Sequence, residues 1–301
     1  MDAARFQEPR RRMIPIRSPW GDGEISVLDF GDPGRAVDVV FLHANGLNAL
    51  TYRSMLAPLS ASLRLIAPDL RGHGASRLRA EPRGRRSWID FRDDVAALLD
   101  VLGGPPVTLA GHSMGATVAL MAAAISPERV ANLILFDPVI WTPSLQTLAR
   151  LPGAQTLIRA RLPLVRGAQR RRPIFESRAA AFQAYRGRGV FVGWPETTLA
   201  DYVAGGFNER ASGGVELACS PDWEASNFAA QANDPWGALE RFAKPTRILR
   251  AERGSPCRMG DPRQLRRRFS QVSLEAVSGR GHFFPIERPD LARDAILDAA
   301  V

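Results

Sequence analysis

Short apolar runs alternate along the chain with longer stretches in which apolar residues recur every three to four positions. Short runs bounded by Gly, Pro or Asn are typical of buried strands, whereas the wider spacing predicts helices. The patterns predict strands near residues 14–16, 25–30, 37–42, 64–67, 107–110, 130–136, 246–250 and 272–277. They predict helices over residues 52–63, 88–102, 116–125, 262–269 and 289–300. This alternation predicts an α/β fold with a mostly parallel central sheet flanked by helices.

The strand and helix pattern is interrupted between about residues 143 and 233. Arginines, prolines and aromatic residues mix in this stretch, and no strand is evident. A segment of this length without structure of its own is improbable inside a compact domain, so we expect a mainly helical insertion. The expected organisation is a core domain formed by residues 1–140 and 234–301, with a helical cap or lid formed by residues 141–233.

The sequence Gly111-His112-Ser113-Met114-Gly115 stands between a predicted strand and a predicted helix. A serine in such a sharp turn has strained backbone angles, and glycines on both sides avoid Cβ clashes where the two elements cross. The unpaired N–H groups of the helix N-terminus suit an oxyanion that forms beside the serine. An ordinary Gly/Ser turn is the alternative, but the flanking strand and helix favour Ser113 as a nucleophile.

A serine hydroxyl needs a base within hydrogen-bond reach before it attacks a substrate. His112 adjoins the serine, so we expect its side chain to point away from it. His43 and His73 lie in loops after early strands, and we treat them as scaffold. His282 follows the last predicted strand, in a loop that can reach the carboxyl edge of the sheet, where catalytic groups of open α/β sheets gather. We therefore predict His282 as the general base.

Four motifs occur in one order along the chain: Phe41–Gly46, Asp69–Ser76, Gly111–Gly115 and Gly281–Pro289. Each motif is weak alone, but together they resemble the α/β-hydrolase superfamily over about residues 22–140 and 234–300. The resemblance implies an α/β-hydrolase fold in which the insertion occupies the position of that family's cap domain. The order of nucleophile, acid and histidine is also the order that this family uses.

The resemblance also implies two donors for an oxyanion hole. The loop from His43 to Gly46 resembles the family loop that supplies one backbone N–H, which here is that of Asn45. Met114 supplies the second N–H. Ala44 stands where glycine is common in the family, and the side chain of Asn45 is an alternative donor. Removing one such donor typically costs about 3 kcal/mol of barrier, so the pair matters for catalysis.

The acid of the catalytic triad departs from the family pattern. Most members carry an aspartate after the second-last strand, where this chain has Gly254 or Ser255. Asp137 follows the strand after the nucleophile helix, a site from which some relatives supply the acid, and Glu252 lies slightly early in the usual turn. We predict Asp137 as the acid and Glu252 as the alternative, with Asp261 or no acid at all as further possibilities.

Composition limits the other classes of function. The 301 residues carry a net charge of +9, almost wholly from arginine. The arginine runs are short, dispersed and without a recognition motif, so no nucleic-acid partner is predicted. The longest apolar stretch, residues 116–125, is half of the roughly 20 residues that span a bilayer, so stable membrane insertion is not expected. No apolar segment follows the charged N-terminus and the cysteines lack metal spacing, which predicts a cytoplasmic protein without a metal or organic cofactor.

These features predict a serine hydrolase that cleaves a carboxylic ester, lactone or thioester through an acyl-enzyme. A serine nucleophile argues against dehalogenation or epoxide opening, because those reactions need a carboxylate that forms an alkyl ester. The aromatic residues of the cap favour a small-molecule substrate with an apolar acyl or aryl group, unless they form the cap's own core. The alternative is a non-catalytic ligand-binding protein or receptor that keeps the pocket, which a missing aspartate would allow.

Overall fold

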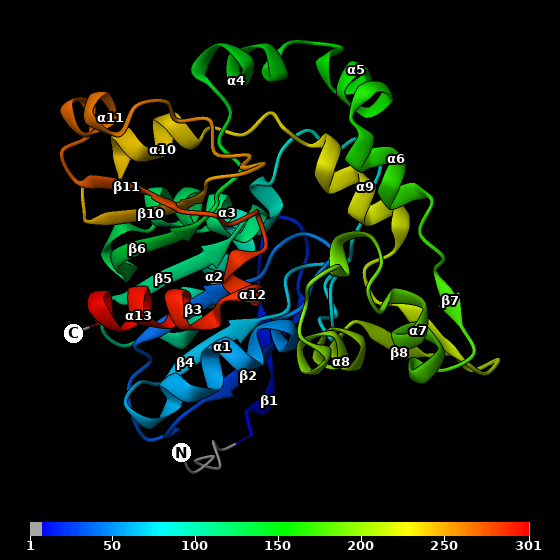
Figure 1. The fold of residues 1–301 in the computed structure, drawn as a ribbon. Helices are drawn as coiled ribbons and strands as arrows, with labels where there is room; N and C mark the ends of the chain where they lie inside the picture. The colour runs from blue at the N-terminus through cyan, green and yellow to red at the C-terminus, as the bar shows by residue number, and fades with distance from the viewer. Residues whose placement is uncertain (1–7, 301) are drawn as a thin grey trace.

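An eight-stranded sheet forms the centre of the structure, a computed structural model that describes residues 8–300 (Figure 1). In spatial order the strands are β1 (Arg10–Ile16), β2 (Gly23–Phe30), β4 (Leu65–Pro68), β3 (Val39–Leu42), β5 (Val107–His112), β6 (Val130–Phe136), β10 (Thr246–Ala251) and β11 (Val272–Val277). β2 pairs antiparallel with β1 and with β4, whereas the other neighbours pair parallel. The predicted mostly parallel sheet is confirmed.

Helices cover both faces of this sheet (Figure 1). They are α1 (Arg53–Leu56), α2 (Ile89–Leu102), α3 (Met114–Ile125), α10 (Pro235–Arg241), α11 (Pro262–Arg268), α12 (Phe284–Glu287) and α13 (Pro289–Ala300). Successive residues of β3 alternate between two apolar clusters: Val40 packs with residues of α2 and α3, and Phe41 with residues of α1 and α13. Both faces of the strand are therefore buried, which explains its uninterrupted apolar run.

The helix predicted over residues 52–63 is wrong in detail. The segment forms two short 3₁₀ helices, Ala49–Tyr52 and Ala57–Ala61, on either side of the four-residue α1. Pro58 lies at the start of the second 3₁₀ helix, and a proline has no backbone N–H to continue the α-helical hydrogen bonds. The apolar spacing is helical, but the proline prevents one continuous helix.

Between β6 and β10 the chain leaves the sheet and forms a second group of helices, which we call the cap (Figure 1). Its elements are α4 (Pro143–Arg150), α5 (Ala154–Arg161), α6 (Pro163–Gln169), β7 (Ile174–Phe175), α7 (Arg178–Tyr185), α8 (Glu196–Gly205), β8 (Phe207–Glu209), β9 (Val215–Leu217) and α9 (Pro221–Ala229). The cap is mainly helical, but β7, β9 and β8 form a small antiparallel sheet that was not predicted. These strands have two or three residues each, too few to leave a recognisable alternation.

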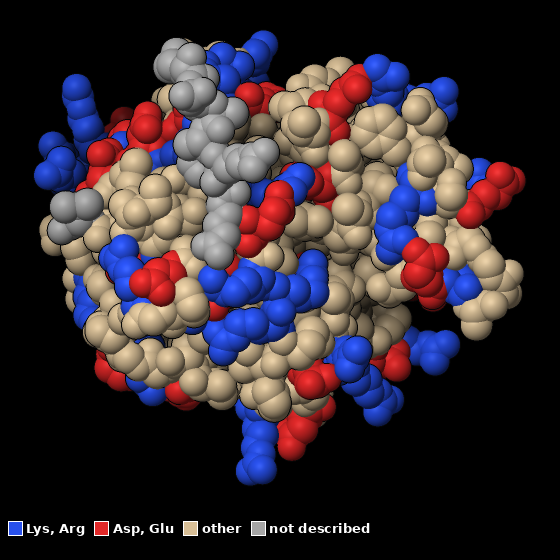
Figure 2. All heavy atoms as spheres, turned by 90° about the horizontal axis from the view of Figure 1, so that it is seen from below, with Lys and Arg blue, Asp and Glu red and all other residues tan. Residues whose placement is uncertain are grey.

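In Figure 2, basic and acidic side chains are scattered among uncharged ones, and several basic side chains lie side by side near the centre of the view. Arg10 and Arg12, from the first arginine run, form ion pairs with buried Asp29 at 3.2 and 3.1 Å. This run therefore lies in a strand and takes part in the fold. In the part of the chain described, no helix has both the length and the apolar character needed to cross a membrane.

Candidate active site

Ser113 lies in the turn between β5 and α3, with a φ of 58° and a ψ of −118°. The crossing of strand and helix is tight on both sides of it. A Cβ on Gly115 would lie 2.4 Å from the carbonyl oxygen of Leu42, and a Cβ on Gly111 would lie 2.6 Å from the carbonyl carbon of Gly115. The expected need for two glycines is confirmed, because no side chain fits at either position.

Ser113, His282 and Asp137 form one continuous hydrogen-bonded chain. His282 Nε2 lies 2.9 Å from Ser113 Oγ, and His282 Nδ1 lies 2.6 Å from Asp137 Oδ2. The register of β5 and β6 explains why Ser113 and Asp137 lie near the same histidine. The two strands pair in parallel up to their last residues, and Ser113 and Asp137 come next in each chain segment. His282 arrives from the loop after β11. With Nδ1–H donated to the carboxylate, Nε2 is free to accept the serine proton.

Asp137 is fully buried and satisfied on both oxygens. Its Oδ1 accepts the N–H of Ala251 at 2.9 Å and the hydroxyl of Ser255 at 2.5 Å. Burial by itself raises the pKa of Asp137, but the hydrogen bonds from His282, Ser255 and Ala251 lower it below its ordinary value. The turn after β10, where the family acid was expected, therefore contributes a hydroxyl that binds the carboxylate.

Backbone strain marks the same two strand ends. Within residues 8–300, Ser113 (φ 58°) and Asp137 (φ 44°) are the non-glycine residues with positive φ. This conformation is uncommon outside glycine and persists where the surroundings impose it, often at functional sites. Strain at both positions points to a functional constraint that the sequence signalled for Ser113 alone.

The alternative acids lie elsewhere. Glu252 is exposed and accepts the N–H of Gly279 at 2.6 Å. Asp261 caps the N-terminus of α11, where it accepts the N–H of Arg263 at 2.7 Å. Neither carboxylate makes a hydrogen bond with His282 among the described residues, so the structure brings only Asp137 to the histidine.

Asn45 lies in the loop after β3, and Met114 is the first residue of α3. The Asn45 side chain is turned towards α9, where Nδ2 donates to the carbonyl of Glu224 at 3.1 Å and Oδ1 accepts from Asn227 Nδ2 at 2.8 Å. Its alternative use as an oxyanion donor is therefore disfavoured. In the described chain, no acceptor is recorded for the backbone N–H of Asn45 or Met114.

A buried chain of hydrogen bonds links the Asn45 loop to the backbone of His282. The N–H of Ala44 donates to Tyr52 Oη at 3.2 Å, Tyr52 Oη lies 2.7 Å from His112 Nδ1, and His112 Nε2 lies 2.9 Å from the carbonyl of His282. Burial lowers the pKa of His112 to about 3, so its ring is neutral. Its Nε2–H must then donate to the carbonyl, and its Nδ1 accepts the tyrosine O–H. Neither ring nitrogen of His112 contacts Ser113 among its described hydrogen bonds, in line with the expectation, but the sequence gave no sign of this link through Tyr52.

Two further histidines brace the Asn45 loop. His43 Nε2 accepts the N–H of Leu70 at 2.9 Å, and His73 Nε2 accepts the N–H of Gly46 at 3.2 Å. Burial lowers the pKa of both rings, which keeps them neutral and able to accept. The structure places both as the expected scaffold.

Aromatic side chains connect the site to the cap. The Phe283 ring lies 5.1 Å from the ring of His282 and 5.6 Å from that of Trp194 in the cap. Trp194 and Tyr202 belong to the same buried cluster as Phe136 of the sheet. These aromatic residues of the cap therefore pack with residues of the central sheet and do not form a separate small core.

No metal-binding cluster accompanies the site. Across residues 8–300, no group of three or more His, Cys, Asp or Glu side chains is placed to hold a metal ion. Cys219 and Cys257 are buried free thiols, and burial raises the pKa of Cys257 to about 12.

Comparison with known proteins identifies the family of the chain. The model of the alpha/beta hydrolase family matches residues 39–295, and the chain belongs to this family. It is 25% identical to the 2-(acetamidomethylene)succinate hydrolase of Mesorhizobium japonicum over 269 residues, which cover 89% of this chain and 90% of that enzyme. A crystal structure of E-2-(acetamidomethylene)succinate hydrolase superposes with a TM-score of 0.73 at 24% identity, covering 96% of this chain and 99% of the other.

Other relatives match over shorter stretches. An uncharacterized protein of Mycobacterium tuberculosis is 35% identical over 136 residues, which are 44% of this chain and 39% of that protein's length. An esterase of the same organism is 35% identical over 156 residues, which are 52% of this chain and 48% of the esterase. The chain is thus a hydrolase-family protein whose named relatives include a hydrolase and an esterase.

Proposed function

We propose that the protein is a serine hydrolase that cleaves a carboxylic ester, lactone or thioester through an acyl-enzyme intermediate. The observation that carries the proposal is the hydrogen-bonded chain from Asp137 through His282 to Ser113, with contacts of 2.6 and 2.9 Å. The similarity to an esterase and to a 2-(acetamidomethylene)succinate hydrolase supports hydrolysis as the reaction class.

In the proposed reaction, Ser113 Oγ attacks the carbonyl carbon while His282 Nε2 takes up the hydroxyl proton. The negative charge that develops on the carbonyl oxygen is stabilised by the backbone N–H groups of Asn45 and Met114. His282 then gives the proton to the leaving group, and the acyl group remains on the serine. A water molecule, deprotonated by His282, attacks the acyl-enzyme and releases the acid. Asp137 holds the histidine tautomer and stabilises the imidazolium.

The surroundings favour an apolar acyl or aryl group on the substrate. Phe283 adjoins His282 and packs against Trp194, so an apolar wall reaches from the cap to the reactive histidine. We propose that residues 141–233 act as the cap domain over a core of residues 1–140 and 234–301. A cytoplasmic location stays a prediction from the sequence.

The receptor alternative loses its main support. It depended on the absence of an aspartate at the usual position, and Asp137 contacts His282 from the end of β6 instead. A binding protein would not need a buried carboxylate, a histidine and a strained serine held in one line.

Reaction with a fluorophosphonate probe tests the proposal. We expect the probe to label Ser113 in the wild-type protein, with no labelling of Ser113→Ala and much slower labelling of His282→Ala. Circular dichroism should show that both variants are folded. A screen of p-nitrophenyl esters, lactones and thioesters then defines the substrate class. Absence of labelling, or labelling that does not depend on His282, would refute a serine hydrolase.

A further inference from the structure

The last cap helix, α9, is in direct contact with the loop that carries Asn45. Asn45 Nδ2 donates to the carbonyl of Glu224 at 3.1 Å, and Asn45 Oδ1 accepts from Asn227 Nδ2 at 2.8 Å. The next loop residue, Gly46, has a φ of 73°, and a Cβ there would lie 2.6 Å from Glu224 Oε1. Side chains and backbone of α9 thus bind Asn45, and the Glu224 side chain lies close against Gly46.

The orientation of both amides follows from groups whose chemistry is unambiguous. Asn45 Nδ2 faces a backbone carbonyl, which only accepts, so its Oδ1 must accept from Asn227 Nδ2. Asn227 Oδ1 then faces the guanidinium of Arg85, which only donates. A flip of either amide would set donor against donor or acceptor against acceptor, so the pair has one satisfied arrangement.

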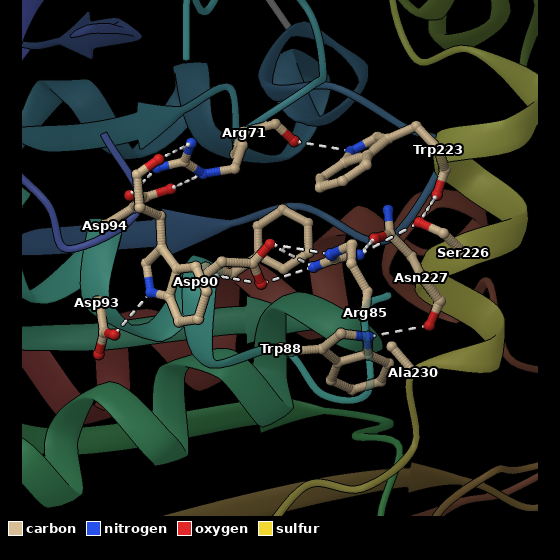
Figure 3. A network of polar contacts seen from close by, with 12 residues as sticks. Arg71, Arg85, Trp88, Asp90, Asp93, Asp94, Trp223, Ser226, Asn227 and Ala230 are labelled. Atoms are coloured by element: carbon tan, nitrogen blue, oxygen red, sulfur yellow. Dashed lines mark hydrogen bonds and ion pairs between the residues drawn. The ribbon is translucent and has the colours of Figure 1, made fainter. Parts of the chain in front are cut away.

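Helix α9 is itself anchored to the core domain by buried contacts (Figure 3). Trp223 Nε1 donates to the carbonyl of Arg71 at 3.0 Å, and Trp88 Nε1 donates to the carbonyl of Asn227 at 2.9 Å. Each tryptophan is 2% exposed, so both bonds are shielded from water. The helix therefore has a fixed position against the core at the turn that contacts Asn45.

Arg85 fixes the Asn227 side chain from behind. Its guanidinium pairs with Asp90 at 2.5 Å and lies 4.1 Å from the centre of the Trp223 ring (Figure 3). It also lies 5.0 Å from the centre of the Phe91 ring. An arginine that is paired with a carboxylate and in cation–π contact with two aromatic rings has little freedom to move. A series of side-chain contacts thus runs from Asp90 through Arg85 and Asn227 to Asn45.

We infer that Asn227 is a positioning residue for the oxyanion hole, which it serves by fixing the Asn45 loop from the cap. The inference rests on the proposed function, in which the Asn45 N–H stabilises the oxyanion. An oxyanion donor must lie within a few tenths of an ångström of its place, because its contribution depends on preorganisation and not on later adjustment. Because α9 belongs to the cap and fixes the position of this N–H, the catalytic rate depends on the position of the cap as well as on the triad.

Substitution of the amide pair tests the inference. We expect Asn227→Ala to lower kcat by about ten- to hundred-fold, with KM within about two-fold of wild type, because the lost interaction acts in the transition state. The inhibition constant of a trifluoromethyl ketone, which forms a tetrahedral oxyanion on Ser113, should rise by the same factor as kcat/KM falls. Asn45→Ala keeps its backbone N–H and should behave alike, and the double variant should lose no more than either single one.

Ser220→Ala is the matched control. Ser220 is the N-cap of α9, where its Oγ accepts the N–H of Trp223 at 3.2 Å, and none of its described contacts is with Asn45, Arg85 or Asn227. It should destabilise α9 without changing kcat or the inhibition constant. Amide hydrogen exchange over residues 44–47 should accelerate in Asn227→Ala and stay unchanged in the control.

Two results would overturn the inference, and they are distinguishable. If the wild-type protein hydrolyses esters and Asn227→Ala has unchanged kcat, inhibition constant and exchange at residues 44–47, the positioning role is wrong and the hydrolase proposal stands. If the wild-type protein neither hydrolyses an ester nor reacts with fluorophosphonate, the proposed function fails and the oxyanion role of Asn227 fails with it.

Discussion

The hydroxyl of Ser255 lies 2.5 Å from Asp137 Oδ1, while His282 Nδ1 contacts the other oxygen of the same carboxylate at 2.6 Å. In the proposed triad, the acid therefore lies outside the turn after β10. The carboxylate comes from the end of β6, and the turn after β10 supplies a donor that holds it. Because Asp137 is buried, every hydrogen bond to it favours the ionised form that the histidine needs.

Substitution Ser255→Ala should therefore remove one hydrogen bond from the Asp137 carboxylate and leave the carboxylate itself in place. The pKa of Asp137, which its hydrogen bonds now lower, should rise, and kcat should fall by about ten-fold, on the scale of 1–2 kcal/mol for a bond to a buried charged group. Steady-state kinetics between pH 4 and pH 8 measure this. Ser273→Ala, at an exposed position of β11, is the control and should match wild type. An unchanged rate and pH profile in Ser255→Ala would show that the hydroxyl has no part in holding the acid.

The choice of acid is tested by a pair of neutral substitutions. Asp137→Asn should lower kcat by about 10⁴-fold, because an amide favours the wrong histidine tautomer and cannot stabilise the imidazolium. Glu252→Gln should change it by less than about two-fold, since Glu252 contacts only the Gly279 N–H among the described side-chain bonds. Turnover of a p-nitrophenyl ester, with thermal unfolding as the check on folding, decides between them. The reverse ranking would contradict the assignment of Asp137.

Tyr52→Phe should separate the Asn45 loop from the His282 loop. The substitution removes the hydroxyl that accepts from Ala44 N–H and donates to His112 Nδ1, which leaves two buried polar groups without a partner. We expect a loss of about 1–3 kcal/mol in the free energy of unfolding, measured with urea, together with a lower kcat. Tyr185→Phe, which removes a hydroxyl on the cap side, serves as the comparison. Equal kcat in wild type and Tyr52→Phe would show that the link is only structural.

Acid should destabilise the protein over a defined pH range. His43, His73 and His112 have pKa values lowered by burial, that of His112 to about 3, so the folded state keeps them neutral. In the unfolded chain each binds a proton below about pH 6.5. The unfolded state thus binds more protons below about pH 6.5. The free energy of unfolding therefore decreases as the pH is lowered, by up to about 1.4 kcal/mol per pH unit for each histidine.

Urea unfolding at pH 7, 6, 5 and 4 measures this slope. In His112→Phe the slope below pH 6.5 should decrease by about one proton, because the unfolded chain has one fewer group to protonate. A slope that is the same in the variant and in wild type would mean that His112 is protonated in the folded state.

The Arg85–Asp90 pair predicts a non-additive pair of variants. Arg85→Met leaves the carboxylate of Asp90 buried without its cation and should cost about 3–5 kcal/mol of unfolding free energy. Arg85→Met combined with Asp90→Asn should recover part of that loss, because the uncompensated charge is gone. Chemical unfolding of the single and double variants provides the test. A double variant less stable than Arg85→Met alone would contradict the importance of charge at this site.

The sequence by itself determined the sheet, the nucleophile turn and the histidine loop. Buried parallel strands need apolar side chains on both faces, and a strand-to-helix turn around a serine needs glycine on either side, so both leave a local pattern. Ser113 and His282 lie in such patterns, so the sequence predicts both without tertiary information. The sequence also favours Asp137 over Glu252 as the acid, but only as a preference between two carboxylates.

Only the tertiary structure decided which carboxylate meets the histidine and what surrounds the pair. The parallel register of β5 and β6 sets Asp137 beside Ser113, and register is a relation between segments that neither segment encodes alone. Asn45 and Asn227 are in contact although they lie 182 positions apart in the sequence. No periodic pattern of side chains in the sequence predicts this contact. Local patterns fix local conformation, whereas hydrogen-bond partners far apart in the chain are chosen by how the packed elements meet.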